Sequence, residues 1–168
     1  MNIKYSADAV SEALRIKVKE LQTRGVLNDR VVYIVMMNGG VWFAIHVFDC
    51  MPDMHNQVYF MKGHSYNGII REHLIWDYFD IPSLEGRDVV VLDDICDTGN
   101  TSRAILKQLQ RRKVKSVHFF TLLSRTSTDT SGLVLDSCIV DDSDDFFYGC
   151  GLDSQGSSDR MHPYIGVC

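Results

Sequence analysis

The sequence predicts an α/β fold, in which an open, mainly parallel and twisted sheet is flanked by helices. The first observation is that strand-like and helix-like stretches alternate along the chain, which favours a parallel sheet covered on both faces. The second is that 168 residues, 45% hydrophobic and 23% charged, suit one domain with a proper core. The third is that two apolar runs, residues 31–37 and 89–92, each lead through a glycine-containing loop into helical sequence.

The first helix is predicted to begin at Ser6, a typical N-cap residue, and to end at about Arg24, with Gly25 just beyond. Apolar residues recur on one face of this segment at helical spacing. They are Val10, Leu14, Val18 and Leu21. We therefore interpret the segment as a packing helix.

A predicted strand at residues 31–37 and a predicted helix at 41–48 flank Asn38, Gly39 and Gly40. Two glycines at a strand-to-helix turn allow the backbone to approach an anion closely. Any tight turn can use two glycines, so this pattern alone is a weak signal.

The next part of the chain predicts two strands joined by a loop. Residues 57–61 (QVYFM) and 74–79 have strand character, and the second strand is expected to return and pair. Residues 62–68 contain two glycines and no periodicity, which predicts a loop. The loop sequence alone fits either a mobile lid or an exposed connection. Residues 81–87 are predicted to form a turn.

The strongest signal lies in residues 89–102 (VVVLDDICDTGNTS), where a short buried strand is followed by Asp93, Asp94 and Asp97. Thr98, Gly99, Asn100 and Thr101 come next, and helical sequence runs from Ser102 to about Arg112. A loop at a helix N-terminus offers free N–H groups and partial positive charge, which suit a phosphate. The carboxylates suit sugar hydroxyls or Mg²⁺. A phosphorylated ribose needs both kinds of group.

Three other interpretations of this stretch are weaker. The DDxxD spacing also occurs in prenyl-diphosphate synthases, but there it lies on a long helix, and the residues on either side of it here have low helix propensity. A phosphoryl-accepting aspartate loop usually has a second aspartate two residues after the first, and Asp97 has none there. A plain acidic turn does not need three acids, a glycine and two threonines in this order.

Beyond the acidic stretch, residues 116–123 and 133–140 are predicted strands and residues 141–145 an acidic turn. Arg125 follows the first of these strands, at the carboxyl end where open α/β sheets bind ligands. The Gly149-x-Gly151 pair lacks the strand and helix of a dinucleotide-binding motif.

The acidic stretch resembles the phosphoribosyl pyrophosphate signature of type I phosphoribosyltransferases: four apolar residues, two acids, two spacers and Asp-Thr-Gly-x-Thr. The C-terminal part resembles the end of the hypoxanthine-guanine branch of that family. The matching residues are Asp144, Phe146, Gly149, Gly151, Leu152, Asp153, Arg160 and residues 163–167 (PYIGV). The resemblance covers residues 31–167 or thereabouts.

This resemblance implies a purine-salvage enzyme that transfers the phosphoribosyl group from phosphoribosyl pyrophosphate to hypoxanthine, guanine or xanthine, with Mg²⁺ as cofactor. It implies Asp97 as general base; Asp93, Asp94, Thr98, Gly99, Asn100 and Thr101 on the phosphoribosyl group; Asn38, Gly39, Gly40 and Arg160 on pyrophosphate; Ser65 and Tyr66 on a lid; Arg125, Phe146, Phe147 and Asp153 at the purine; and Asp93, Asp94 and Asp153 on the metal. The Phe147 contact is expected from its backbone.

The resemblance also implies a cis peptide between Met37 and Asn38, a homodimer or homotetramer, and one domain over residues 1–168 whose hood comes from parts of 1–25 and 141–168. The chain departs from the family at three places. Asn38 and Arg125 stand where the family has lysines, and the segment between Asp153 and Arg160 is one residue longer than usual.

Composition narrows the class of protein. The net charge is −5 with no basic tract, which argues against non-specific nucleic-acid binding. No apolar run approaches the roughly 20 residues that span a bilayer, and the N-terminus lacks the apolar core of a signal peptide. The five cysteines include no C-x-x-C pair, which predicts free thiols and a cytoplasmic protein. A non-catalytic, nucleotide-sensing RNA-binding regulator with the same fold stays the alternative.

Overall fold

A six-stranded sheet forms the centre of the computed structural model, which describes residues 2–65, 74–78, 81–153 and 159–168. In spatial order the strands are β4 (Leu74–Tyr78), β3 (Gln57–Ser65), β2 (Val32–Met37), β5 (Asp88–Cys96), β6 (Ser116–Arg125) and β7 (Leu135–Asp141). All neighbours pair in parallel except β3 and β4. The predicted open, mainly parallel sheet is therefore confirmed.

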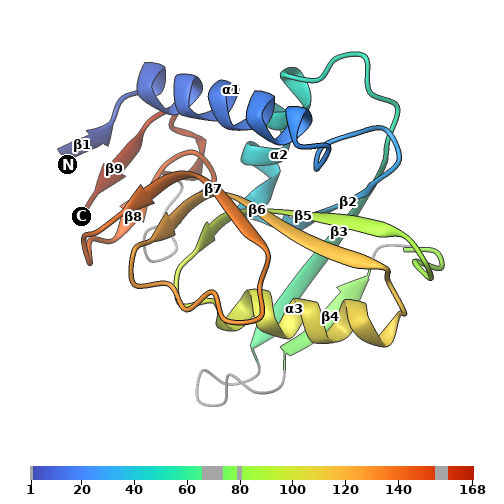
Figure 1. The fold of residues 1–168 in the computed structure, drawn as a ribbon. Coiled ribbons are helices and arrows are strands. Elements are labelled where there is room, and N and C mark those ends of the chain that lie inside the picture. Colours follow the sequence, from blue (N-terminus) through green and yellow to red (C-terminus); the bar gives the residue numbers. More distant parts are fainter. Residues whose placement is uncertain (1, 66–73, 79–80, 154–158) are drawn as a thin grey trace.

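Helices cover both faces of this sheet (Figure 1). Two of them, α1 (Ala7–Thr23) and α2 (Gly40–Asp49), lie on one face, and α3 (Asn100–Arg111) lies on the other. The first helix begins as predicted, because the Ser6 hydroxyl accepts a hydrogen bond from the Ala9 amide at 3.3 Å.

The two faces of each central strand pack into different clusters of buried residues. In β2, Tyr33 and Val35 pack in the cluster that contains the buried face of α1, whereas Val32 and Ile34 pack with Ile105 and Leu109 of α3. Successive side chains of a strand point to opposite faces. A strand buried on both faces must be apolar throughout, which explains the unbroken run VVYIVMM.

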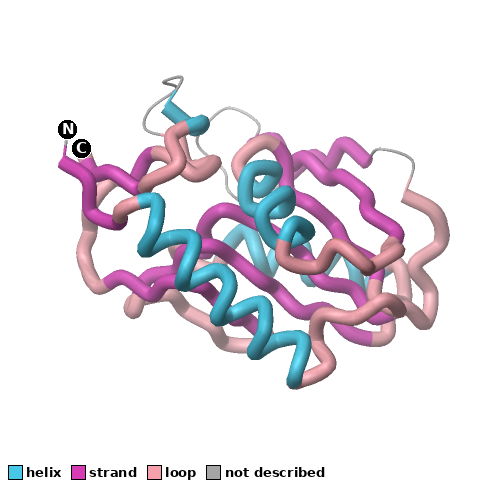
Figure 2. The backbone as a smooth tube through the Cα atoms, turned by 90° about the horizontal axis from the view of Figure 1, so that it is seen from above, coloured by secondary structure: helices cyan, strands magenta, loops and turns pink. Residues whose placement is uncertain are grey.

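The two ends of the chain meet in a second, three-stranded sheet with the order β1 (Asn2–Tyr5), β9 (Ile165–Val167) and β8 (Phe147–Tyr148). Both neighbouring pairs are antiparallel. The N- and C-termini lie next to each other (Figure 2). A short 3₁₀ helix, η1 (Asp159–Met161), precedes β9. This terminal sheet joins segments that are far apart in the sequence.

Two strands are much longer than the sequence predicts, and a third, β6, extends two residues further than predicted, to Arg125. The acids Asp93 and Asp94 belong to β5 itself, because the ladder with β6 continues to the pair Cys96 and Ser124. Residues 62–65 were expected in a loop, but they extend β3 by pairing with β4 up to Ser65 and Leu74. In both cases a neighbouring strand satisfies the backbone of a polar segment, and the local sequence does not reveal that neighbour.

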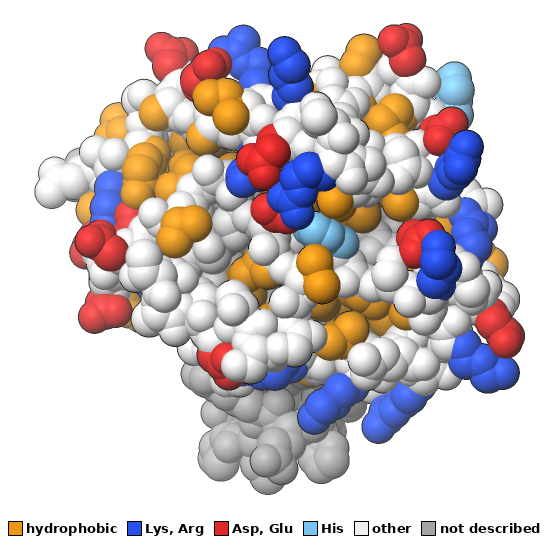
Figure 3. All heavy atoms as spheres, viewed as in Figure 1, with side chains coloured by type: hydrophobic (Ala, Val, Ile, Leu, Met, Phe, Trp, Pro, Cys, Tyr) orange, Lys and Arg blue, Asp and Glu red, His pale blue; other side chains and the backbone are white. Residues whose placement is uncertain are grey.

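The outer surface mixes charges of both signs. On the face shown in Figure 3, acidic and basic side chains are interspersed. No helix in the part of the chain that the structure describes combines the length and the apolar character that crossing a bilayer requires.

Candidate active site

The candidate site lies where the connections of the sheet change direction. From β2 the chain crosses through α2 to β3 on one side, and from β5 it crosses through α3 to β6 on the other. Ligands of open α/β sheets bind at such a switch point, beyond the carboxyl ends of the strands. A cavity of about 530 Å³ opens there, between residues that end β2 and residues that end β5.

Asp93 and Asp94 form an acidic pair in the wall of this cavity. The Asp94 amide donates to Asp93 Oδ1 at 2.9 Å, and the Ile95 amide donates to Asp94 Oδ1 at 2.8 Å. Burial raises the pKa of both carboxyls, and the charge of Asp94 raises the pKa of Asp93 further. The pair therefore favours a ligand that brings hydrogen-bond donors or positive charge.

The loop after β5 lines the same cavity. Thr98, Gly99, Asn100 and Thr101 all contribute to its wall, together with Asp97. Gly99 is the N-cap of α3 with φ of +78°, and a Cβ there would lie 2.3 Å from the Asp129 carbonyl oxygen. The left-handed backbone and the close contact both require glycine. The helix begins at Asn100, two residues earlier than predicted, so the expected phosphate loop includes the first turn of the helix, whose amides lack intrahelical partners.

Asn38 and Gly39 complete the opposite wall of the cavity. The predicted cis peptide between Met37 and Asn38 is confirmed. Gly39 has φ of −61°, which any residue adopts, yet a Cβ there would lie 1.8 Å from Asp94 Oδ2. The reason for glycine is thus the close approach of this turn to the acidic pair. Gly40 lies against β5, where a Cβ would be 2.8 Å from the Leu92 carbonyl oxygen.

Arg160 brings the C-terminal part of the chain to the cavity. Its Nη1 donates to the Gly151 carbonyl at 2.6 Å and lies 4.0 Å from Asp94 Oδ2. Its Nη2 pairs with Asp153 Oδ2 at 2.6 Å. The longer segment before Arg160 therefore does not keep this guanidinium from the acidic pair.

The donor set for a cation is open rather than closed. Asp153 Oδ1 is buried and has no hydrogen-bond partner among the residues that the structure describes, and a buried unpaired carboxylate oxygen suits a metal or its bound water. Asp93, Asp94 and Asp153 were expected to hold Mg²⁺ together. Among the described residues, however, no three His, Cys, Asp or Glu side chains converge as a metal cluster. This arrangement fits Mg²⁺, which usually takes one or two carboxylates and keeps water and substrate phosphate as its other ligands.

A second cavity, of about 390 Å³, adjoins the first and shares Asp97 and Thr98 with it. Phe146 lines it with 64% of its surface exposed, whereas Phe147 is buried. A free aromatic face beside a carboxylate can stack on a flat heterocycle and hydrogen-bond its edge.

Arg125 also lines this second cavity, but its guanidinium already has protein partners. Nε donates to Asp97 Oδ1 at 2.5 Å, Nη2 donates to the Asp145 carbonyl at 2.8 Å, and Nη1 donates to the Ser143 carbonyl. The sequence predicted that Arg125 contacts the purine, which stays a prediction; the structure shows that its guanidinium contacts Asp97, the predicted general base.

The expected lid falls largely outside the part that can be described. Ser65 ends β3, but its side chain and Tyr66 lie outside the described residues. Sequence reasoning assigned no role to Ser127, Asp129 or Asp144, which also line the second cavity, although Asp144 belongs to the C-terminal motif. The segment after β6 follows a parallel strand next to β5, so the rule on carboxyl ends of strands could have found the first two.

Comparison with known proteins gives consistent matches. Residues 36–155 match the family model described as the phosphoribosyl transferase domain. A hypoxanthine-guanine phosphoribosyltransferase from Streptococcus thermophilus is 29% identical over 161 residues, which cover 93% of this chain and 88% of the relative. One from Staphylococcus epidermidis is 30% identical over 141 residues, which cover 82% and 76%.

Solved structures agree with these matches. A hypoxanthine phosphoribosyltransferase from Staphylococcus aureus superposes with a TM-score of 0.82 at 26% identity, covering 99% of this chain and 91% of that one. A hypoxanthine-guanine-xanthine phosphoribosyltransferase gives a TM-score of 0.82 at 25% identity, covering 99% and 96%.

Proposed function

We propose, from the premise that this chain belongs to the phosphoribosyl transferase domain family, that it is a purine-salvage phosphoribosyltransferase of the hypoxanthine-guanine branch. It transfers the phosphoribosyl group from phosphoribosyl pyrophosphate to hypoxanthine or guanine and releases pyrophosphate. The observation that carries the proposal is the pair of adjoining cavities that share Asp97 and Thr98. One suits a sugar phosphate, the other suits a flat base, and the shared residues lie at their junction.

The sugar-phosphate cavity holds the part of the substrate that does not react. In the proposal, the amides and hydroxyls of residues 98–101 bind the 5′-phosphate, and Asp93 and Asp94 accept hydrogen bonds from the ribose hydroxyls. This anchoring fixes the anomeric carbon relative to the base, which lowers the entropic part of the barrier.

The opposite wall receives the leaving group. The backbone amides of the turn at Asn38, Gly39 and Gly40 and the guanidinium of Arg160 are the proposed pyrophosphate donors. Mg²⁺, held by the acidic pair and through water by Asp153, would offset the charge of the departing pyrophosphate. Asn38 lacks the positive charge of the lysine found in the family. Arg160, which lies 4.0 Å from Asp94 Oδ2, supplies a positive charge on this wall.

The second cavity orients the base. Phe146 stacks on the purine in this proposal, the Phe147 backbone recognises its edge, and Asp97 accepts the N7 proton as the bond from N9 to the anomeric carbon forms and the bond to pyrophosphate breaks. Arg125 Nε donates to Asp97 Oδ1 at 2.5 Å, and this hydrogen bond orients the carboxylate in the proposal.

The test is pyrophosphate release measured with Mg²⁺, phosphoribosyl pyrophosphate and each of hypoxanthine, guanine, xanthine and adenine. We expect release with hypoxanthine or guanine and none with adenine. No pyrophosphate release with any of the four bases, together with RNA bound to the purified protein, would instead support the RNA-binding regulator. The names of the relatives do not favour that alternative.

Two further parts of the proposal concern the cell and the assembly. All five cysteines are free thiols, which supports a reducing cytoplasmic location. A homodimer or homotetramer stays a prediction, and light scattering after gel filtration measures it.

A further inference from the structure

We propose that Lys4, in the N-terminal strand, is a positioning residue for the purine cavity. It would act through residues 141–147, called here the purine-side segment, and through Arg125 on Asp97. The inference rests on the proposed function for its kinetic consequence, but its structural part can be tested without substrate. Lys4 itself lines neither of the two cavities of the candidate site.

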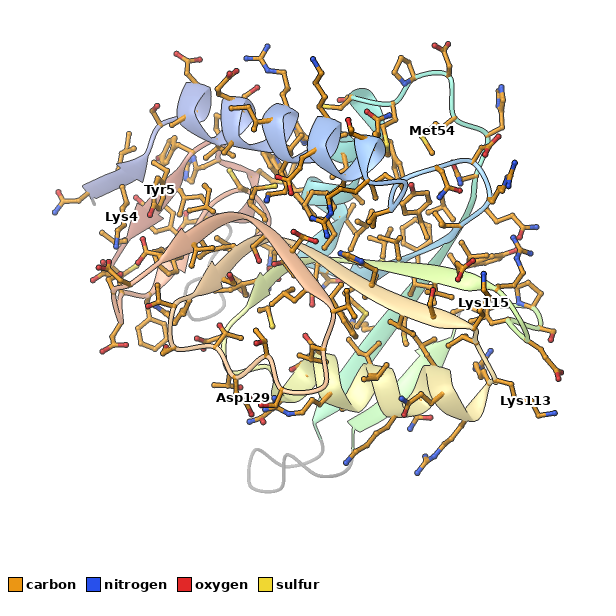
Figure 4. The ribbon with its side chains drawn as sticks, viewed as in Figure 1. Lys4, Tyr5, Met54, Lys113, Lys115 and Asp129 are labelled. Carbon is orange, nitrogen blue, oxygen red and sulfur yellow. The ribbon has the colours of Figure 1, made fainter. Side chains whose placement is uncertain are left out.

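The Lys4 ammonium contacts the purine-side segment at three side chains. Nζ donates to Asp141 Oδ1 at 3.0 Å, to Ser143 Oγ at 2.6 Å and to Asp145 Oδ2 at 3.0 Å. All three donors of an ammonium group are thereby used. Figure 4 shows Lys4 and Tyr5 together on β1, and the Tyr5 hydroxyl donates to Asp141 Oδ2 at 2.5 Å.

The backbone of β1 favours this placement. Its ladder with β9 pairs Ile3 with Gly166 and Tyr5 with Ile165, and the register shifts between those two pairs, at Lys4. Such an irregularity bends a strand and redirects a side chain. Lys4 and Tyr5 can therefore both contact Asp141, although consecutive side chains of a regular strand point to opposite faces.

Arg125 binds the same segment through its backbone. Its Nη atoms donate to the carbonyls of Ser143 and Asp145, two of the three residues whose side chains accept from Lys4. Its Nε donates to Asp97 Oδ1 at 2.5 Å. The guanidinium carbon lies 5.0 Å from the centroid of the Phe147 ring, and Lys4 Nζ lies 5.3 Å from it. Two cations thus hold one segment and one aromatic ring.

Loss of the Lys4 contacts should affect the purine cavity more than the sugar-phosphate cavity. Asp144 and Phe146 of the purine-side segment line the purine cavity, but no residue of this segment lines the sugar-phosphate cavity. Releasing the segment would therefore displace the aromatic face and the Arg125 contact, while the phosphate loop keeps its own contacts. A general loss of folding would instead weaken binding of both substrates.

The experiment compares the variants Lys4→Met and Lys4→Arg with the wild type. Lys4→Met keeps the aliphatic stem and removes the charge, and Lys4→Arg restores it. The matched control is Lys17→Met, which removes a lysine of α1 whose Nζ lies 2.8 Å from Glu20 Oε2 and 3.8 Å from Asp136 Oδ1 and which lines neither cavity. For Lys4→Met we expect the KM for the purine to rise roughly three- to tenfold, as for loss of a partly exposed charged hydrogen-bond cluster. The KM for phosphoribosyl pyrophosphate should change less than twofold.

Hydrogen exchange of the substrate-free protein supplies the structural test. We expect faster exchange in residues 141–147 of Lys4→Met than of the wild type, partial recovery in Lys4→Arg and no change in Lys17→Met. Unchanged exchange in Lys4→Met would overturn the inference, and so would equal increases in both KM values with unchanged folding. If the wild type catalyses no transfer, the proposed function fails, while the exchange result still decides whether Lys4 holds the segment.

Discussion

Replacing Asp97 with asparagine separates the chemistry of the proposed site from its stability. The change keeps an oxygen that can accept from Arg125 Nε but removes the carboxylate that would take the N7 proton. A general base typically contributes a factor of about 10²–10⁴ to the rate. We therefore expect kcat to fall by about that factor, which corresponds to about 3–5 kcal/mol of transition-state stabilisation at 1.36 kcal/mol per tenfold.

The structure sets a much smaller expectation for folding. The Asp97 side chain is 54% exposed, so its pair with Arg125 is largely screened by water. Exposed ion pairs contribute about 0–1 kcal/mol, and Arg125 keeps its contacts with the carbonyls of Ser143 and Asp145. The free energy of unfolding should thus fall by no more than about 1 kcal/mol.

The assay combines three measurements on the purified variant: pyrophosphate release, calorimetric binding of phosphoribosyl pyrophosphate with Mg²⁺, and urea unfolding. We expect a large loss of rate, near-normal binding and near-normal unfolding. Asp53→Asn is the control, because Asp53 is an exposed acid outside the purine-side segment and lines neither cavity of the site. An unchanged rate in Asp97→Asn would refute the assignment of the base.

Three further predictions concern two residues of the same site and Asp141 at the end of β7. Gly39→Ala should destabilise the fold by roughly 1–3 kcal/mol, as overpacking does, because its Cβ would meet Asp94 Oδ2 at 1.8 Å; an unchanged urea midpoint would contradict the close approach. Asp93→Asn should raise the thermal midpoint of the ligand-free protein at pH 7.5 and lower transfer activity. The reason is that the pKa of Asp93 is raised in the folded state, so folding becomes less favourable as pH rises from the unfolded pKa of about 3.9 through the folded pKa. A lower midpoint would count against a buried acidic pair. For Asp141 the pH dependence of stability has the opposite sign. Burial by itself raises its pKa, but hydrogen bonds from Ser143, Tyr5 and Lys4 lower the pKa overall. The contribution of Asp141 to stability is therefore present above about pH 3.9 and is lost as pH falls through its folded pKa. The stability difference between wild type and Asp141→Asn in urea should therefore shrink below about pH 4, and a difference independent of pH would exclude this explanation.

Much of the architecture could be predicted because burial constrains which residues occur at neighbouring positions of the sequence. The run from Val89 to Leu92 is apolar because both faces of β5 are covered, and the Ser6 cap and the spacing of Val10, Leu14, Val18 and Leu21 mark α1 before any tertiary contact is known. The order of Asp97, Thr98 and Gly99 similarly predicts a phosphate-binding loop, since such a loop needs a helix N-terminus, a left-handed glycine and hydroxyls within a few residues.

The sequence by itself therefore determined the fold class, the family and the stretch that is proposed to carry the chemistry. Only the tertiary structure decided how that stretch is used: that Asp93 and Asp94 belong to the strand, that Gly39 is required by its contact with Asp94, and that Arg125 binds Asp97. It alone brought Lys4 to a segment about 140 residues away. The physical reason is that periodicity and capping depend on neighbours along the chain, whereas the partner of a charged side chain depends on which strands the sheet places next to one another.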